Sequence, residues 1–254
     1  MKAAIVADNG LAIADVPRPE PAANEVLVRV RAAGLNRAEL SMAAGHVTGV
    51  DVSEPMLGLA RTRVATAGLG PARVTLLRSD AATHDFVPEA FDRALSRLGV
   101  MFFDAPVAAF ANIRRGLRAG APIAFVCFRR LADNPFFVLP FEAARPHLPP
   151  TPPADPLAPG QFAFANADRV RGILSAAGFR DITITPEDPM IEGGTLDEAC
   201  DRMGRIGPLS RAFLAASPEQ QAAATAAVRA ALATADGPEG VRLPVGIWVV
   251  SARA

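Results

Sequence analysis

The stretch GVDVSEPMLGLAR at residues 49–61 joins a strand-like run to a helix-like one. Apolar residues from 46–52 surround Asp51, which predicts a short strand ending in a carboxylate. Ser53 is a common helix-capping residue type, and glycines follow about fifteen residues later, so a helix is expected over 54–67. A strand followed by an acid and then a helix is typical of one unit of an α/β sheet.

Strands and helices continue to alternate on the C-terminal side of this stretch. Further strands are expected at 73–78, 91–96, 98–103, 123–128, 181–185 and 246–252. Further helices are expected at 107–117, 167–177, 195–206 and 218–234. This alternation predicts βαβ units and a Rossmann-like, doubly wound, mainly parallel sheet with helices on both faces.

Residues 131–165 interrupt the alternation. The segment is rich in proline and also carries five phenylalanines, among them Phe136, Phe137 and Phe162. A low-complexity linker would not hold so many aromatic residues. The composition favours an ordered lid or substrate loop over a plain connector.

The composition argues against several classes of binding partner. The 26 basic and 26 acidic residues cancel, so nucleic acid and anionic membranes are not expected partners. No apolar run has the length of a membrane span. Cys127 and Cys200 lack metal-ligand spacing and suggest reduced core thiols, so no metal site is predicted. The first ten residues lack signal-peptide features, and a cytoplasmic protein is expected. The sequence assigns no oligomeric state.

Polar groups at successive strand ends suggest a nucleotide site. Asp51 is placed to accept hydrogen bonds from ribose hydroxyls, with Met56 one helical turn on and able to cover a purine ring. Asp80, with the backbone of Ala81, can read the edge of adenine. Each has a plainer interpretation, since Asp51 could cap the next helix, Met56 could be core and Asp80 could start a turn. A third strand end is expected at Ser96-Arg97, where backbone groups would face the ligand crevice. Three strand ends in the right order argue more strongly than any one.

Four segments together resemble class I S-adenosylmethionine-dependent methyltransferases, in the small-molecule branch akin to ubiquinone/menaquinone-biosynthesis methyltransferases. They are GVDVSEPMLGLAR (49–61), SDAATHDF (79–86), FDRALSRLGVMFFDAPVAAFANIRRGLRAG (91–120) and IAFVCF (123–128). The resemblance covers residues 46–254 and implies a seven-stranded sheet with one antiparallel strand.

The resemblance also implies roles for individual residues. S-adenosylmethionine would be the cofactor and a small molecule the methyl acceptor. The cofactor-binding residues would be Asp51 and Val52 at the ribose, Met56, Asp80 and Ala81 at adenine, and Ser96 and Arg97 near the methionine end.

The chain departs from this family before residue 46. No (D/E)xGxGxG loop precedes Asp51, and residues 1–45 instead resemble the N-terminus of a medium-chain quinone oxidoreductase or alcohol dehydrogenase, through MKAAIV, LAIADVPRPEP and NEVLVRVRAAGLNRAEL. This second resemblance brings no nucleotide-binding half. The two patterns meet near residues 44–49, which suggests a gene fusion.

Two arrangements of this N-terminal segment are open. In one, residues 25–32 fill the first-strand position, 36–44 form the first helix, and Gly34 supplies the last loop glycine. In the other, residues 1–24 pair separately as a hairpin and the main sheet is incomplete. Side chains at Val30 and Ala32 would stand where backbone should approach the ligand, so cofactor affinity is expected to fall.

Three functions follow from these observations. The first is S-adenosylmethionine-dependent methyl transfer to a small molecule, impaired by the missing loop. The alternative is a non-catalytic domain of this fold with weak or no cofactor binding, and a truncated oxidoreductase is the least favoured. No catalytic residue is assigned, because His84, His147 and Asp133 are more simply surface or capping residues.

Overall fold

The computed structural model of the chain describes residues 2–7, 10–15, 39–43, 46–150, 155–203 and 209–254. The chain divides into two compact units. The first holds residues 1–127, 167–185 and 249–254, and the second holds 128–166 and 186–248.

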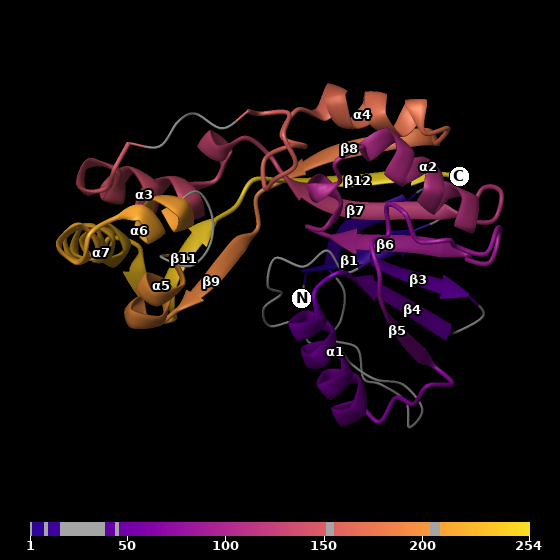
Figure 1. Cartoon of the computed structure of the whole chain (residues 1–254), viewed down its shortest axis with the longest axis horizontal. Coiled ribbons are helices and arrows are strands. Elements are labelled where there is room, and N and C mark those ends of the chain that lie inside the picture. Colours follow the sequence, from indigo (N-terminus) through magenta and orange to yellow (C-terminus); the bar gives the residue numbers. More distant parts are fainter. Residues whose placement is uncertain (1, 8–9, 16–38, 44–45, 151–154, 204–208) are drawn as a thin grey trace. The chain divides into compact units, whose positions relative to one another are not determined.

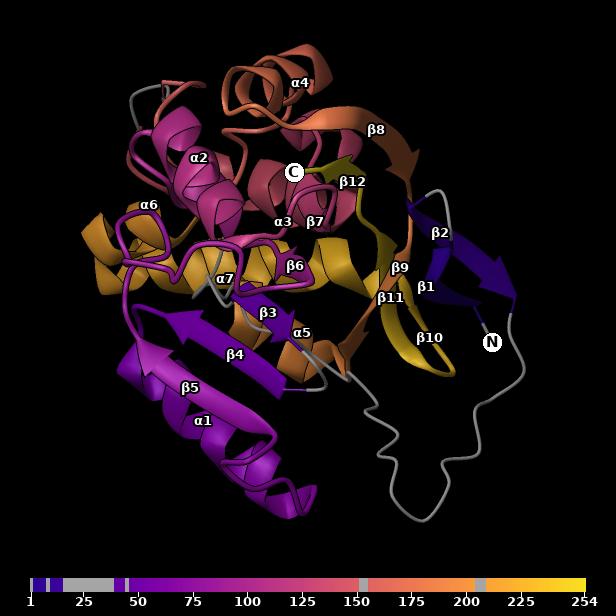
Figure 2. The same ribbon diagram turned by 90° about the vertical axis from the view of Figure 1, so that its right-hand side faces the viewer.

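The first unit is built on a seven-stranded sheet with the strand order β5-β4-β3-β6-β7-β12-β8 (Figure 1). The strands are β3 (Glu39–Ala43), β4 (His46–Asp51), β5 (Val74–Arg78), β6 (Arg93–Arg97), β7 (Pro122–Phe128), β8 (Arg180–Glu187) and β12 (Ile247–Arg253). The helices are α1 (Glu54–Thr66), α2 (Pro106–Gly116) and α4 (Ala167–Ala176). Figure 2 shows α1 on one side of the sheet and α2 with α4 on the other. The predicted α/β sheet with helices on both faces is therefore present.

The directions of the strands are more mixed than expected. β4 and β5 are parallel, as are β6 and β7. β3 is antiparallel to both of its neighbours, β4 and β6. Ala121 bonds with Ala254 and Arg129 with Gly246, a register in which β7 and β12 run antiparallel. The expectation of one antiparallel strand is wrong, because β3, the third strand of the seven, is antiparallel in addition to β12.

β3 also corrects the prediction of a helix over 36–44. Glu39–Ala43 alternates polar and apolar residues at its start, and its last residue pairs with His46 across a two-residue connection. A helix of so few residues is marginal by itself, whereas a central strand gains ladder hydrogen bonds on both edges. Long-range pairing therefore outweighs local helix propensity. The predicted strand at 25–32 lies outside the described residues.

A separate hairpin precedes this sheet. β1 (Lys2–Ala7) and β2 (Gly10–Asp15) pair antiparallel, with Ala7 opposite Gly10. The hairpin prediction for the first residues is confirmed. The accompanying expectation of an incomplete main sheet is wrong, because β3 completes it.

The core of the first unit lies where α2 and α4 meet the sheet. Phe110 of α2 is fully buried and its ring lies 5.4 Å from that of Phe125 in β7. Phe103 and Phe179 meet Phe110 edge-on. The strand expected over 98–103 is instead a 3-10 turn, η1 (Val100–Phe102), because Leu98 adopts a φ of 61° and ends β6.

The second unit combines short helices with a three-stranded sheet. The sheet order is β10-β11-β9, and the strands are β9 (Met190–Gly194), β10 (Asp236–Gly237) and β11 (Gly240–Pro244). The helices are η2 (Leu131–Asp133), α3 (Pro135–Ala144), η3 (Arg145–His147), α5 (Leu196–Met203), α6 (Ser210–Ala215) and α7 (Pro218–Ala233). A capping box between Ser217 and Gln220 starts α7, as its sequence favours.

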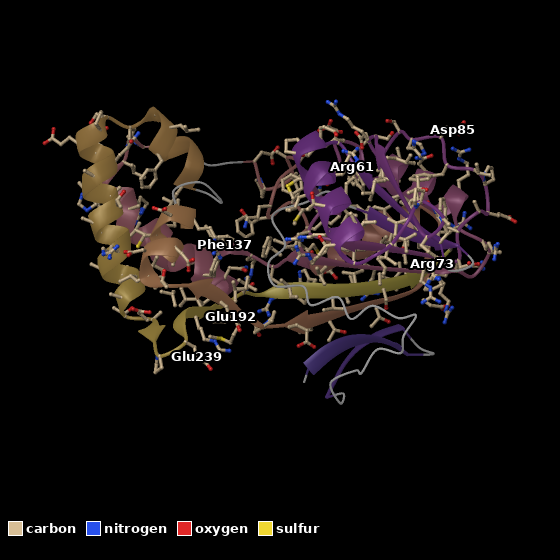
Figure 3. All side chains as sticks on the ribbon, turned by 90° about the horizontal axis from the view of Figure 1, so that it is seen from below. Arg61, Arg73, Asp85, Phe137, Glu192 and Glu239 are labelled. Atoms are coloured by element: carbon tan, nitrogen blue, oxygen red, sulfur yellow. The ribbon has the colours of Figure 1, made fainter. Side chains whose placement is uncertain are left out.

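The proline-rich segment contributes helices and aromatic residues to this unit. Phe136 and Phe137 of α3 are both buried. The Phe137 ring lies 5.2 Å from that of Phe128 and 6.0 Å from that of Phe162, and Figure 3 labels Phe137. Within the described residues, no helix is long and apolar enough to cross a membrane.

Candidate cofactor site

The ends of β4 and β5 bring the first predicted site residues together. Asp51 is the last residue of β4 and lies opposite Arg78, the last residue of β5. The backbone N–H of Ser79 then donates to the carbonyl oxygen of Asp51 at 3.1 Å. Asp51 and the segment that begins at Ser79 therefore leave the sheet side by side at its carboxyl edge, where open α/β sheets bind ligands.

Asp51 carries a buried carboxylate with one oxygen unused. Its exposed fraction is 3%. Oδ1 accepts a hydrogen bond of 2.7 Å from the backbone N–H of Ser53. Oδ2 is buried and accepts none from any residue that the structure describes. A turn-forming role accounts for Oδ1 alone, and a buried carboxylate oxygen without a donor is costly unless a ligand supplies one.

Val52 directly follows Asp51 in the sequence, and Met56 lies in the first turn of α1. Both are half-buried, whereas the next residue, Leu57, is 3% exposed and belongs to the core. The plain core interpretation therefore fits Leu57 better than Met56. A half-buried thioether one turn into α1 remains available to an aromatic ring.

The segment after β5 folds into a compact turn around Asp80. The Asp80 carbonyl oxygen accepts from the N–H groups of Thr83 and His84, and its Oδ1 accepts from that of Ala82 at 2.9 Å. Ala81 is 5% exposed. The Asp80 side chain is exposed, and the backbone next to it is held by hydrogen bonds within the turn. One oxygen of the Asp80 carboxylate is used in the turn.

β6 carries the two residues predicted near the methionine end. Ser96 is 8% exposed, and its Oγ has no hydrogen-bond partner among the described residues. The pKa of Arg97 is lowered by burial and, to a smaller extent, by the charge of Arg63. A buried hydroxyl beside a half-buried guanidinium gives this strand end polar groups that suit a polar ligand.

β3 separates the two halves of the predicted site. Glu39, its first residue, lies opposite Val50 on one side and Ser96 on the other. Strands in a sheet lie about 4.8 Å apart, so the β4 and β6 backbones are roughly 10 Å apart at this edge. The structure thus brings Asp51, Asp80 and Ala81 to one side of β3 and Ser96 and Arg97 to the other. Gly34 lies outside the described residues.

Sequence reasoning missed Asn112, which contacts the turn around Asp80. Its Nδ2 donates to the carbonyl oxygens of Ala81 at 3.1 Å and His84 at 2.8 Å. Asn112 stands three residues after buried Ala109 and four before buried Gly116 on α2. A polar residue within the apolar spacing of a helix is the sequence signal that could have identified it.

None of the three conceivable bases is marked as a catalytic group. The Nδ1 atom of His84 lies 3.1 Å from the hydroxyl of Ser79. The hydrogen bond from Arg130, aided by the charges of Arg130 and Arg129 against burial, lowers the pKa of Asp133, which makes it a weaker base. His147 is exposed in η3. Among the described residues, no group of three potential metal ligands is present.

Comparison with known families adds an independent finding. Residues 32–125 match a family model described as a methyltransferase domain. This match begins before β3 and ends within β7. It therefore contains the strand ends at Asp51, Asp80 and Ser96. A search of curated proteins gave no match.

Several solved structures are similar to the chain. The YcgJ protein from Bacillus subtilis is 16% identical, with a TM-score of 0.50 and 81% of each chain covered. The [4+2]-cyclase SpnF is 21% identical, with a TM-score of 0.45 over 81% of this chain and 65% of the cyclase. A phosphoethanolamine N-methyltransferase from Haemonchus contortus in complex with S-adenosyl-L-methionine is 20% identical, with a TM-score of 0.45 over 81% and 42%.

The chain is shorter than two of these relatives, spanning 65% of the cyclase and 42% of the Haemonchus enzyme. At identities of 16–21%, the similarity to these structures shows a shared fold only. The family match applies to residues 32–125. The family match supports S-adenosylmethionine as the cofactor. Residues 32–125 therefore match a methyltransferase domain, and the chain shares its fold with the YcgJ protein.

Proposed function

We propose that the chain binds S-adenosylmethionine at the carboxyl edge of its seven-stranded sheet and transfers the methyl group to a small molecule. The observation that carries the proposal is the buried Oδ2 of Asp51, which has no donor among the described residues. A ribose hydroxyl would supply that donor. The turn around Asp80 leaves the sheet at the same edge, which suits an adenine ring attached to that ribose.

The residues present fit such a cofactor in part. In the proposal Asp51 and Val52 hold the ribose, Met56 covers adenine, Asp80 and Ala81 read the adenine edge, and Ser96 and Arg97 bind toward the methionine end. The unpartnered hydroxyl of Ser96 supports the last assignment. When bound, S-adenosylmethionine supplies an activated methyl group. The protein then contributes mainly orientation of the acceptor and exclusion of water, so a base is optional.

The proposal assigns residues 131–165 to the methyl acceptor. This segment places Phe136, Phe137 and Phe162 in an aromatic cluster with Phe128. Phe162 is the half-buried member of this cluster, and its ring suits an acceptor with an apolar or aromatic body. A cytoplasmic location is part of the proposal, and the two free cysteines, Cys127 and Cys200, support it.

A non-catalytic domain with weak cofactor binding is the second candidate, and the direction of β3 favours it. A parallel first strand would leave the sheet at the carboxyl edge, and its loop would continue toward the ligand. β3 begins at that edge with Glu39 and ends at the other, where Ala43 pairs with His46. The C-terminal end of β3 therefore lies at the edge opposite to the one proposed for the cofactor.

Calorimetric titration separates these candidates. The proposal expects S-adenosylhomocysteine to bind, and to bind at least about tenfold more tightly than adenosine because the amino-acid half adds contacts. Equal affinities for the two ligands would favour the non-catalytic candidate. No heat with millimolar S-adenosylhomocysteine would overturn the proposal. A nicotinamide dinucleotide serves as the control ligand, and its binding would instead support the oxidoreductase interpretation.

A further inference from the structure

We infer that Asn112 is a positioning residue that holds the adenine-reading turn and thereby sets the preference for adenine over other purines. The inference rests on the proposed function, because it concerns the same nucleoside site. The turn comprises residues 79–86, and Asn112 lies on α2. Sequence separations of 31 and 28 residues join Asn112 to its two backbone acceptors.

Both donor hydrogens of the Asn112 amide engage the turn. Nδ2 donates to Ala81 O at 3.1 Å and to His84 O at 2.8 Å. These two carbonyls lie on either side of the segment that folds back onto Asp80. One side chain thus bridges Ala81 and His84 within the turn, and fixes the backbone of the residue proposed to meet the purine edge.

The acceptor end of Asn112 is also engaged. Its Oδ1 accepts from the guanidinium of Arg115 at 3.2 Å, and the same guanidinium donates to Asp85 at 2.8 Å. This assignment leaves Nδ2 facing the two carbonyls, where an oxygen would be repelled. The Asp85 side chain is largely exposed at the surface of the first unit, so its ion pair adds little stability (Figure 3).

α2 holds the neighbouring chain as well. The N–H groups of Glu89 and Phe91 donate to the carbonyls of Arg115 and Gly116. A Cβ on Gly116 would lie 2.9 Å from the Cβ of Phe86, so the glycine permits this close approach. The segment from the turn to β6 is therefore docked along the C-terminal half of α2, and the side chains of Asn112 and Arg115 contact the turn itself.

Two opposite substitutions test the inference. Asn112→Asp keeps the side-chain size and the Arg115 contact, but replaces the donor with an acceptor facing two carbonyls. Asp85→Asn is the matched control, since it makes the reverse change on the exposed ion pair and leaves Asn112 intact. Asn112→Ala removes the donor without adding charge, and stands in if Asn112→Asp fails to fold.

The first measurement is hydrogen exchange of the 79–86 backbone in the ligand-free chain. Asn112→Asp and Asn112→Ala are expected to speed exchange about tenfold, because the loss of two partly buried hydrogen bonds favours local opening. Asp85→Asn is expected to leave exchange unchanged. Wild-type exchange rates in both Asn112 variants would overturn the inference.

The second measurement is the ratio of Kd values for inosine and adenosine, by calorimetry. The wild type is expected to favour adenosine, and the Asn112 variants to reduce this preference about tenfold. A purely structural role would lower stability and leave the ratio alone, which would overturn the inference while S-adenosylhomocysteine still binds. Failure of the wild type to bind any adenosine ligand would overturn the proposed function and the specificity role together.

Discussion

The backbone N–H of Ser79 donates a 3.1 Å hydrogen bond to the carbonyl oxygen of Asp51. This bond joins the ends of two parallel strands one residue beyond their last pair, Asp51 and Arg78. It places the carboxylate proposed for ribose next to the turn proposed for adenine, with both held by backbone. The residues proposed to bind adenosine are therefore held in place by β4 and β5, and this arrangement does not depend on the residues before β3.

Asp51→Asn separates a binding role from a structural one. The change keeps the side-chain size and removes the charge that faces the proposed ribose. We expect the Kd for S-adenosylhomocysteine to rise by at least about tenfold, since a hydrogen bond to a charged group is worth about 1.5–3 kcal/mol. The free energy of unfolding of the ligand-free chain should stay the same or increase, because a buried unpaired oxygen is relieved. Loss of stability with unchanged ligand affinity would contradict this.

The local parts of this edge follow from the sequence. The strand that ends at Asp51 and the helix that starts at Glu54 were expected from apolar spacing and capping signals. Both are present, and Ser53 is at the N-cap position but makes no capping hydrogen bond with its side chain. These features depend on neighbours within about one helical turn or one strand. The pattern of acid after strand is therefore readable without tertiary information.

The features that the sequence did not predict depend on residues far away in the chain. Residues 36–44 are short enough to suit a helix or a strand, and pairing with β4 and β6 decides the outcome at Glu39–Ala43. Asn112 has its acceptors about thirty residues away, so the helical spacing marks it as a polar residue among apolar ones but does not show what it contacts. The left-handed Leu98 is similar, because its N–H bonds to Val126 on the neighbouring strand.

Ser41→Pro tests the central position of β3. Ser41 pairs with Thr48 on one side and Ala94 on the other. Proline lacks the backbone N–H and is not accommodated in the middle of a sheet, so the free energy of unfolding should fall by at least about 3 kcal/mol in urea titration. Ser41→Thr retains the N–H and suits a strand, so it should cost less than about 1 kcal/mol. Equal stability of the two variants would place β3 outside the folded sheet.

Two glycine-to-alanine changes test how closely α2 packs on the adenine-reading turn. At Gly116 a new Cβ would lie 2.9 Å from the Cβ of buried Phe86, so we expect Gly116→Ala to cost about 1–3 kcal/mol despite its gain in helix propensity. At Gly172 on α4 nothing lies within 4 Å, and Gly172→Ala should stabilise by up to about 1 kcal/mol. Thermal unfolding of both variants measures the difference, and a stabilising Gly116→Ala would show that the packing is loose.

Asp133 gives the second unit a pH-dependent contribution to stability. The Arg130 guanidinium, hydrogen-bonded to the carboxylate, holds the pKa of Asp133 below its ordinary value; burial opposes this effect, while the charges of Arg130 and Arg129 add to it. A folded-state pKa below the unfolded one adds stability above the ordinary value of about 4, and that stability is lost as pH falls through the folded value.

Asp133→Asn removes the titrating group and reveals this contribution. We expect the variant to be less stable than the wild type at pH 6, by under about 1 kcal/mol because Arg130 is largely exposed, and the difference to shrink as pH falls below about 4. Glu142→Gln, which removes an exposed pair with Arg145, is the control and should change stability little at either pH. Urea unfolding at pH 6 and pH 3 provides the comparison. A difference that is the same at both pH values would mean that Asp133 acts through packing and hydrogen bonding, with no contribution from its charge.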